Sequence, residues 1–221
     1  MMPAKNDLTT LYRIVRQALD CSDDIWYRYV VQSDICGCNL SHNEEQSVLD
    51  GAVLTAASMA QCIIAKHGCL SPQELLAVLN IKLEHTVEDL CEPYLYLGLY
   101  EPAVRTVILN DSAISLVKEF IRENNLDVFT PIDDIMRIAL FHEIFHALEE
   151  DTPDIYTRSR MLKRKILGIF PYRRGLCSVS EVGALHFSKC LTGISYSPCI
   201  YERYLLMALN RVSIDFLSPK V

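Results

Sequence analysis

The sequence lacks the long hydrophobic run of a membrane span, the paired cysteines of a zinc ribbon and the apolar stretch of a signal peptide. Its longest hydrophobic candidate, AVLTAASMAQCIIA, is interrupted by Thr, Ser and Gln and falls short of the roughly 18 apolar residues that a span needs. The one close pair among nine cysteines, Cys36 and Cys38, is a C-x-C rather than a C-x-x-C. The start MMPAKNDLTT is polar and no apolar segment follows. We therefore expect a cytoplasmic protein with free thiols and no membrane partner.

Positive charge is also scarce in this chain. Lys and Arg number 21 against 28 Asp and Glu, which gives a net charge of -7. A general binder of nucleic acid or of membrane surfaces needs a basic surface, so we expect neither kind of partner. Half of the 221 residues are hydrophobic, which is enough for one large domain or for a core with an appended subdomain.

The N-terminal third of the chain is predicted to be helical. The segment LTTLYRIVRQALD repeats apolar residues at the spacing of an amphipathic helix. Ser41 followed by Glu44 is a capping-box pattern, and a long alanine-rich helix then runs to Gly68. Its wide apolar face predicts that it is largely buried. Because these helices lack clustered basic residues, we interpret residues 1–70 as a helical subdomain that packs on the core or mediates self-association, and not as a DNA-binding unit.

Residues 71–221 are predicted to combine helices with a few strands. IKLEHT alternates apolar and polar residues like a half-buried strand, and YLYLGLYEPAVRTVILN predicts two strands joined by a tight turn at EPAV. Thr130, followed by Pro131 and Asp133, predicts the start of a helix whose second half carries the segment HEIFH. The expected fold class is α+β, mostly helical, with a small antiparallel sheet packed beside the HEIFH helix.

The segment ALFHEIFHALEED carries the strongest chemical signal. His142 and His146 are four residues apart and share a helical face, so both imidazoles can reach one ion. Glu143 would lie beside that metal as a base that takes a proton from water. A chain with six histidines in 221 residues is expected to contain only about 0.01 chance matches to H-E-x-x-H. Burying these polar side chains in an apolar helix is costly unless something binds them. We therefore predict a metal site instead of two satisfied core histidines.

A catalytic zinc usually needs a third protein ligand. The extended metzincin motif is excluded, because Glu149 and Thr152 stand where its Gly and His would be. The best supplier is Glu181 in SEVGALHF, although Ser178 and Glu181 also form a capping-box pattern in which the carboxylate would only close a helix start. Spacing leaves three other candidates open: His186, Glu149 and Asp154.

The two motifs together resemble those of the ImmA/IrrE-type zinc metallopeptidases. In that family H-E-x-x-H is followed by E-x-x-A-x-x-F, which reads EVGALHF from Glu181 onward, and the resemblance covers roughly residues 71–200. It implies a zincin-like core over 71–221 in which Zn²⁺ is held by His142, His146 and Glu181, with Glu143 as the catalytic base. Members of the family are implicated in cutting regulatory proteins, often transcriptional repressors, which implies a protein or peptide substrate.

The sequence departs from this family at several positions. Leu185 stands where Asn is common, Gly183 stands where a second acidic residue is frequent, and Phe145 replaces a frequent Gly before the second histidine. There is also no Asp four residues after Glu181 to orient a ligand histidine, as thermolysin-like enzymes have, because Leu185 occupies that position. These departures leave the substrate open.

A basic segment separates the two motifs. It holds a third of the 21 basic residues, namely Arg158, Arg160, Lys163, Arg164, Lys165, Arg173 and Arg174. One interpretation is a docking surface for an acidic partner or substrate segment. The interpretation that we favour is a solvated helix face with Met161, Leu162 and Ile166 packed beneath it. Tyr172 and Arg173, together with His186, are candidates for stabilising the oxyanion of peptide hydrolysis.

The sequence as a whole predicts a zinc-dependent metallopeptidase. The main alternative is a non-catalytic zinc-binding or protein-interaction module with a degenerate peptidase fold, and a third interpretation is a helical interaction protein without metal. Zinc is inferred from the donor types, since two imidazoles and a carboxylate also suit Mn, Fe or Co. Glu143→Gln separates the first two interpretations, because it should abolish turnover in an enzyme and change little in a binding module.

Overall fold

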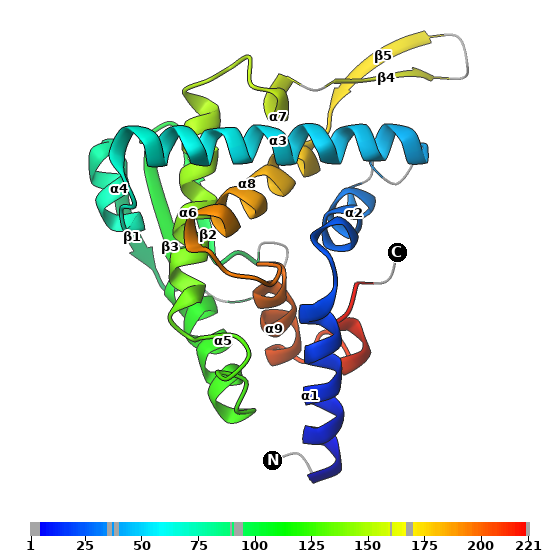
Figure 1. The fold of residues 1–221 in the computed structure, drawn as a ribbon, viewed down its shortest axis with the longest axis vertical. Helices are drawn as coiled ribbons and strands as arrows, with labels where there is room; N and C mark the ends of the chain where they lie inside the picture. Colours follow the sequence, from blue (N-terminus) through cyan, green and yellow to red (C-terminus); the bar gives the residue numbers. More distant parts are fainter. Residues whose placement is uncertain are drawn as a thin grey trace.

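A computed structural model describes residues 5–34, 37, 40–88, 90, 95–159, 161–166 and 170–219. The fold is α+β and mostly helical, as predicted (Figure 1). The helices are α1 Lys5–Asp20, α2 Asp23–Ser33, α3 His42–His67, α4 Pro72–Val78, α5 Asp111–Glu123, α6 Asp134–Glu150, α7 Tyr156–Ser159, α8 Cys177–Thr192, α9 Ile200–Ala208 and the 3-10 turn η2 Ile214–Phe216. The strands are β1 Lys82–Thr86, β2 Gly98–Glu101, β3 Thr106–Asn110, β4 Met161–Ile166 and β5 Phe170–Gly175.

The three-stranded sheet is mixed and not antiparallel throughout. Its order is β1-β3-β2. The predicted hairpin is confirmed, with Gly98 opposite Leu109 in antiparallel register, but β1 pairs with β3 in parallel, with Lys82 opposite Thr106. The prediction of an antiparallel sheet is therefore wrong for β1. The reason is that β3 is buried along most of its length while β1 is largely exposed, so the most apolar strand takes the centre and β1 is added on its far edge.

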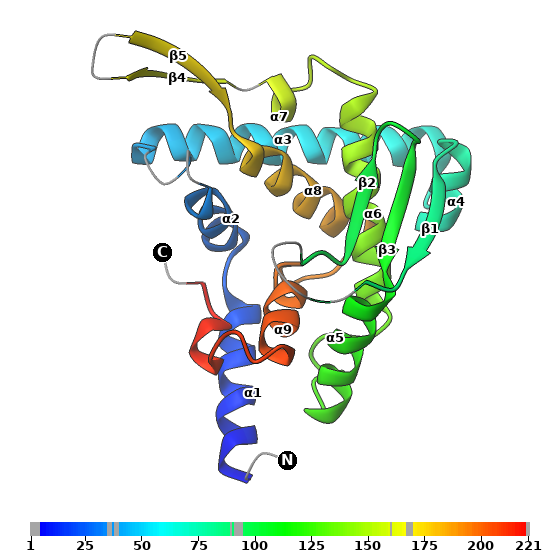
Figure 2. The same ribbon diagram turned by 180° about the vertical axis from the view of Figure 1, so that it is seen from behind.

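Helix α3 has the predicted ends but less burial than predicted. The capping box of Ser41 and Glu44 is present, and the helix ends at Gly68 with φ of +79°. Its buried face is rich in alanine, including Ala52, Ala56 and Ala60, and packs across α8 (Figures 1 and 2). The opposite face is open to solvent. The expectation that α3 is largely buried is therefore wrong, because its apolar residues are spread around the helix while neighbours cover only one side.

One helix among the described residues, α3, is long and apolar enough to cross a membrane by length and composition alone. The core helices of soluble proteins pass the same test. In this fold one face of α3 packs against α8, α2 and α7.

Two helix starts differ from the sequence prediction. Helix α6 begins at Asp134, and its N-cap residue Asp133 makes no side-chain capping bond. Thr130 instead donates its hydroxyl to the carbonyl of Leu126 at 3.3 Å. Helix α8 begins at Cys177. Glu181 therefore lies inside the helix and not in a capping box at its start, which leaves the carboxylate available for other contacts.

The buried residues form one cluster that extends from Leu11 in α1 to Leu217 near the C-terminus. Helix α6 lies between α8 on one side and strands β2 and β3 on the other (Figure 2). Helices α2 and α3 pack against α8, so the N-terminal helices share the core of residues 71–221. The division into subdomains at residue 70 stays a prediction.

The basic segment forms a β-hairpin where we predicted a helix face. Strands β4 and β5 pair antiparallel from Met161 opposite Gly175 to Ile166 opposite Phe170. Both views show this hairpin projecting beyond the helical body (Figures 1 and 2). Pro171 in its second strand would disrupt a helix. Arg160 and the side chains of the two strands, those of Tyr172 and Arg173 included, lie outside the described part of the chain.

Candidate metal centre

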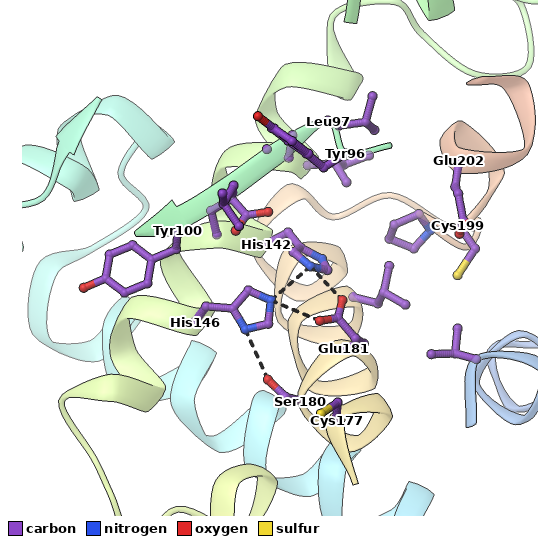
Figure 3. Close-up of a pocket in the computed structure, with 18 of the residues that line it drawn as sticks. Tyr96, Leu97, Tyr100, His142, His146, Cys177, Ser180, Glu181, Cys199 and Glu202 are labelled. Atoms are coloured by element: carbon purple, nitrogen blue, oxygen red, sulfur yellow. Dashed lines mark hydrogen bonds and ion pairs between the residues drawn. The ribbon is translucent and has the colours of Figure 1, made fainter. Parts of the chain in front are cut away.

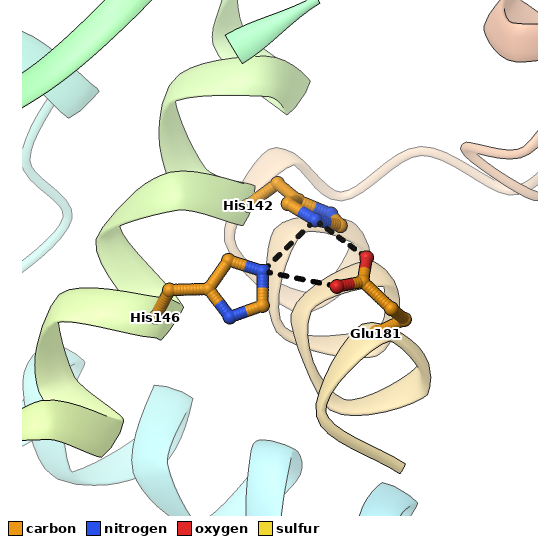
Figure 4. Close-up of side chains that lie close together, drawn as sticks. All are labelled: His142, His146 and Glu181. Atoms are coloured by element: carbon orange, nitrogen blue, oxygen red, sulfur yellow. Dashed lines mark hydrogen bonds and ion pairs between the residues drawn. The ribbon is translucent and has the colours of Figure 1, made fainter. Parts of the chain in front are cut away.

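Three predicted residues from two helices meet at one point. His142 and His146 project from the same face of α6 toward Glu181 on α8 (Figure 4). The Nε2 atoms of the histidines are 3.2 Å apart, His142 Nε2 is 3.3 Å from Glu181 Oε2, and His146 Nε2 is 3.7 Å from Glu181 Oε1. All of the potential ligand atoms lie within 4.8 Å of one another. The i, i+4 spacing supplies two of them, and the packing of α8 on α6 supplies the third.

These separations fit a tetrahedral ion. Zinc binds imidazole nitrogen and carboxylate oxygen at roughly 2.0–2.2 Å, and a tetrahedral arrangement of such ligands places neighbouring donor atoms about 3.3–3.5 Å apart. The two histidine nitrogens are 3.2 Å apart, close to that range, and they lie 3.3 and 3.7 Å from different oxygens of Glu181. Two imidazoles and one carboxylate would supply three ligands to such an ion. Because the carboxylate is half exposed on the cleft side, the fourth ligand position would face the cleft.

A close helix contact sets the position of Glu181. Gly183 lies against the ring of Phe145, and a methyl group in its place would stand 2.7 Å from the end of that ring. Phe145 is fully buried and also packs on Phe187, with ring centroids 5.4 Å apart. The glycine therefore lets α8 approach α6 closely enough for Glu181 to reach His146. Phe145 and Gly183 are two of the departures from the family pattern, and here they contact each other.

Glu143 lies between the cleft and the sheet. Its side chain is buried and lies beside the backbone of Tyr100 in β2. A Cβ atom on Gly98 would lie only 3.0 Å from Glu143 Cγ, so the absence of a side chain at Gly98 makes room for the carboxylate. Burial raises the pKa of Glu143 above its ordinary value, although His142 and His146 oppose the shift. A carboxylate with a raised pKa is a better proton acceptor near neutral pH.

The pKa values of Glu181 and His146 are shifted in opposite directions. Burial alone would raise the pKa of Glu181, but its hydrogen bond to His142 and the charge of both histidines lower that pKa to about 2. Burial alone would lower the pKa of His146, but its bond to Glu149 and the charge of Glu181 raise it to about 9. Each shift has the direction expected for a carboxylate and an imidazole that lie close together.

The candidate ligands line the floor of a cleft of about 850 Å³ (Figure 3). One wall is β2, which is an edge strand of the sheet, and the other walls come from α2, α8 and α9. Much of the lining is apolar or aromatic, including Leu97, Leu99, Tyr100, Leu185 and Leu205. Such a cleft can hold an extended chain with apolar side chains next to the three donor groups.

The remaining candidates from the sequence lie elsewhere or have other contacts. His186 shares a hydrogen bond of 3.1 Å between its Nδ1 and Tyr27 Oη and is absent from the residues that line the cleft. Asp154 is exposed and belongs to no cluster of ligands among the described residues. Glu149 lies behind His146, on the Nδ1 side.

Sequence reasoning missed two contributors to the site, Ser180 and Gly98. Ser180 Oγ lies 3.1 Å from His146 Nδ1. No spacing rule links residue 180 to residue 146, and the contact depends on how two helices pack. Gly98 matters through the space that it leaves beside Glu143, and a glycine in a strand is the only signal of such a close approach.

Comparisons of the chain with protein-family models, with curated proteins and with solved structures find no match. The function is therefore inferred from the geometry and chemistry of the site itself.

Proposed function

We propose that this chain is a zinc-dependent metallopeptidase that hydrolyses a peptide bond in a protein or peptide substrate. The observation that carries the proposal is the meeting of His142, His146 and Glu181 at separations that fit a tetrahedral ion, beside the buried carboxylate of Glu143. The four side chains supply two imidazoles, one carboxylate ligand and one base, which is the set of groups that zinc hydrolases of the H-E-x-x-H type use.

The residues of the chain divide the chemistry between them. His142, His146 and Glu181 would hold the ion, which when bound supplies a Lewis acid that polarises the scissile carbonyl and acidifies water. Glu143 accepts a proton from the attacking water and passes it to the departing amine. Its burial between α6 and the sheet, where Gly98 leaves room for it, limits the positions that the carboxylate can take.

Strand β2 offers a way to hold the substrate in an extended form. It pairs with β3 along one side only, and its residues Leu97 to Tyr100 line the cleft. An extended peptide can add to such an edge through main-chain hydrogen bonds while its side chains enter pockets. The proposed substrate is therefore an extended, unfolded or loop segment of a protein, and the resemblance in the sequence points to a regulatory protein.

We place this activity in the cytoplasm. The six cysteines whose placement the structure describes are all free thiols, namely Cys21, Cys62, Cys69, Cys177, Cys190 and Cys199. Free thiols, several of them exposed, are expected in a reducing compartment. Two cysteines, Cys177 and Cys199, line the cleft, and the proposal gives neither a catalytic role. Burial raises the pKa of Cys199 to about 12, which disfavours its thiolate.

The test combines metal analysis with proteolysis. The purified chain is expected to contain about one zinc per molecule by elemental mass spectrometry, the stoichiometry of one three-ligand site. It is also expected to cut unfolded protein substrates or a random peptide library in a way that a chelator abolishes. Zinc bound without any cleavage, by both the wild type and Glu143→Gln, would instead favour the non-catalytic zinc module. Absence of zinc after the metal is supplied would reject both.

A further inference from the structure

Glu149 is a buried carboxylate to which the proposed reaction assigns no role. Its side chain is 3% exposed, and its Oε1 atom has no hydrogen-bond partner in the described part of the chain. It lies in the last turn of α6, which contains no basic residue and where the helix dipole presents partial negative charge. A carboxylate in this position is unfavourable unless its contacts compensate, so those contacts indicate what it does.

The contacts of Glu149 lie directly behind His146. Glu149 Oε2 is 3.1 Å from His146 Nδ1 and accepts the hydroxyl hydrogen of Ser180 at 2.5 Å. Ser180 Oγ is itself 3.1 Å from the same Nδ1 atom. The three groups therefore form a closed triangle. Because an ionised carboxylate only accepts hydrogen bonds, the bond to Glu149 requires Nδ1 of His146 to carry a proton.

This arrangement fixes the tautomer of the neutral imidazole. With the proton on Nδ1, the lone pair of His146 is on Nε2, and Nε2 is the atom that faces His142 and Glu181. The Ser180 hydroxyl lies on the opposite side of the ring (Figure 3), and Glu149 Oε2 lies 3.1 Å from the same Nδ1 atom. A histidine that binds metal through one nitrogen is commonly oriented by a carboxylate on the other.

We propose that Glu149 and Ser180 are positioning residues that hold His146 in the tautomer and ring orientation needed to bind a metal ion. The inference rests on the metal site of the proposed function. The orienting carboxylate comes from the ligand's own helix, three residues after His146. Helix α8 supplies one ligand from Glu181 and, from the residue before it, the hydroxyl that supports another.

The experiment measures zinc affinity by competition with a chromophoric chelator. Glu149→Ala is expected to weaken binding about 10–100-fold, the usual cost of losing a residue that orients a ligand. Ser180→Ala should weaken it less, and Glu149→Gln should recover part of the loss, because its amide oxygen still accepts from Nδ1–H. Glu150→Gln is the matched control, since it removes a negative charge one residue away on an exposed side chain that pairs with Arg158, and its zinc affinity should equal that of the wild type.

Cobalt substitution separates positioning from a merely structural role. The visible absorption of bound Co²⁺ depends on ligand geometry, so Glu149→Ala and Ser180→Ala should shift it, while Glu150→Gln should not. Wild-type zinc affinity together with a wild-type cobalt spectrum in both variants would overturn the inference and leave the proposed function standing. If the wild-type chain binds neither ion, both proposals fail. If Glu149→Ala does not fold, Ser180→Ala decides by the same two criteria.

Discussion

Helices α6 and α3 are both long and apolar in sequence, yet they are buried to different extents in the fold. Ten of the 17 residues of α6 are buried, against seven of the 26 residues of α3. The buried residues of α6 include two carboxylates, Glu143 and Glu149, whereas α3 leaves Leu54 69% exposed. Helix α3 also buries one carboxylate, Glu45, which pairs with Arg28, so the more deeply buried helix carries one buried carboxylate more.

The two helices differ in the kind of contact that they make with neighbouring elements. Along α3, alanines at four-residue intervals allow close packing on α8, and this packing does not require the opposite face of the helix to be covered. Along α6, the polar residues make specific contacts with Ser180 and Glu181. Buried charge persists only where such partners exist, so the polar residues of α6 mark the candidate site, whereas the apolar residues on the outside of α3 mark none.

The largest expected effect is that of Glu143→Gln. Removing the base should lower turnover of a cleaved peptide by about 10²–10⁴-fold, while the zinc content stays that of the wild type, because Glu143 is not one of the three ligands. The measurement is kcat on a fluorogenic peptide beside elemental analysis of the same preparation. Equal turnover in the variant and the wild type would contradict the role of Glu143.

Loss of a ligand should have the next largest effect. His146→Ala and Glu181→Ala are each expected to weaken zinc binding by more than about 100-fold, beyond the usual cost of losing a residue behind a ligand. His85→Ala is the control, because this histidine is exposed and pairs only with Asp111 at the surface. Retention of zinc in Glu181→Ala would show that a residue other than Glu181 is the third ligand.

Gly183→Ala tests whether the helix contact positions the site. The added methyl group would meet the buried Phe145 ring at 2.7 Å, and overpacking of this kind costs about 1–3 kcal/mol in the free energy of unfolding. It should also weaken zinc binding, because α8 must move away from α6. Phe145→Leu in the same chain should restore part of both losses. Purely additive effects in chemical denaturation and chelator competition would show that the two positions are not coupled.

Asp151→Asn tests a surface ion pair that ties the β2–β3 turn to the end of α6. Arg105 donates to both carboxylate oxygens of Asp151 at 2.7 Å, and this bond lowers the pKa of Asp151. Because the pKa of Asp151 is lower in the folded protein than in the unfolded chain, where it is about 4, the ion pair stabilises the fold at pH values above that unfolded pKa. This contribution to stability disappears as the pH falls through the pKa of Asp151 in the folded protein. Because Asp151 is 46% exposed, the loss at pH 7 should be at most about 1 kcal/mol. Urea titrations of both proteins at pH 7 and below pH 3 measure it, and a difference that persists in acid would refute the assignment.

The smallest expected effect is on the outer face of α3. Leu54→Lys should change the free energy of unfolding by no more than about 0.5 kcal/mol, because the side chain is 69% exposed. The contrasting variant is Ala56→Leu, on the face packed against α8, which should cost about 1–3 kcal/mol. Thermal unfolding compares the two variants. Strong destabilisation by Leu54→Lys would mean that this face is covered in solution.

Local patterns predicted many of the elements well. The capping box at Ser41, the hairpin around EPAV and the helix end at Gly68 are present in the structure. These signals depend on residues within a few positions of each other, so they can be recognised in the sequence without knowledge of the fold. The pairing direction of β1 could not be predicted in this way, because it depends on which strand becomes the buried centre.

The helix starts near Thr130 and Ser178 were predicted wrongly for a related reason. Both segments match the capping pattern, but Thr130 bonds instead to the preceding turn and Ser178 lies within α8. The segment with the basic residues was expected to be a helix face and is a hairpin. In each case a local preference was weak compared with the contacts made by the surrounding chain.

The sequence by itself determined the local part of the candidate centre: His142 and His146, at i and i+4, share one face of any helix, and Glu143 follows directly after the first of them, whatever packs around that helix. Only the tertiary structure brought Glu181, Ser180 and the edge of β2 to that helix, because these contacts join segments tens of residues apart through the packing of α8 and the sheet on α6. The reason is physical: helical periodicity is a local property of the backbone, whereas the third ligand and the residues that orient the histidines depend on side-chain volumes, such as the absent side chain of Gly183 against Phe145, that act only when two helices meet.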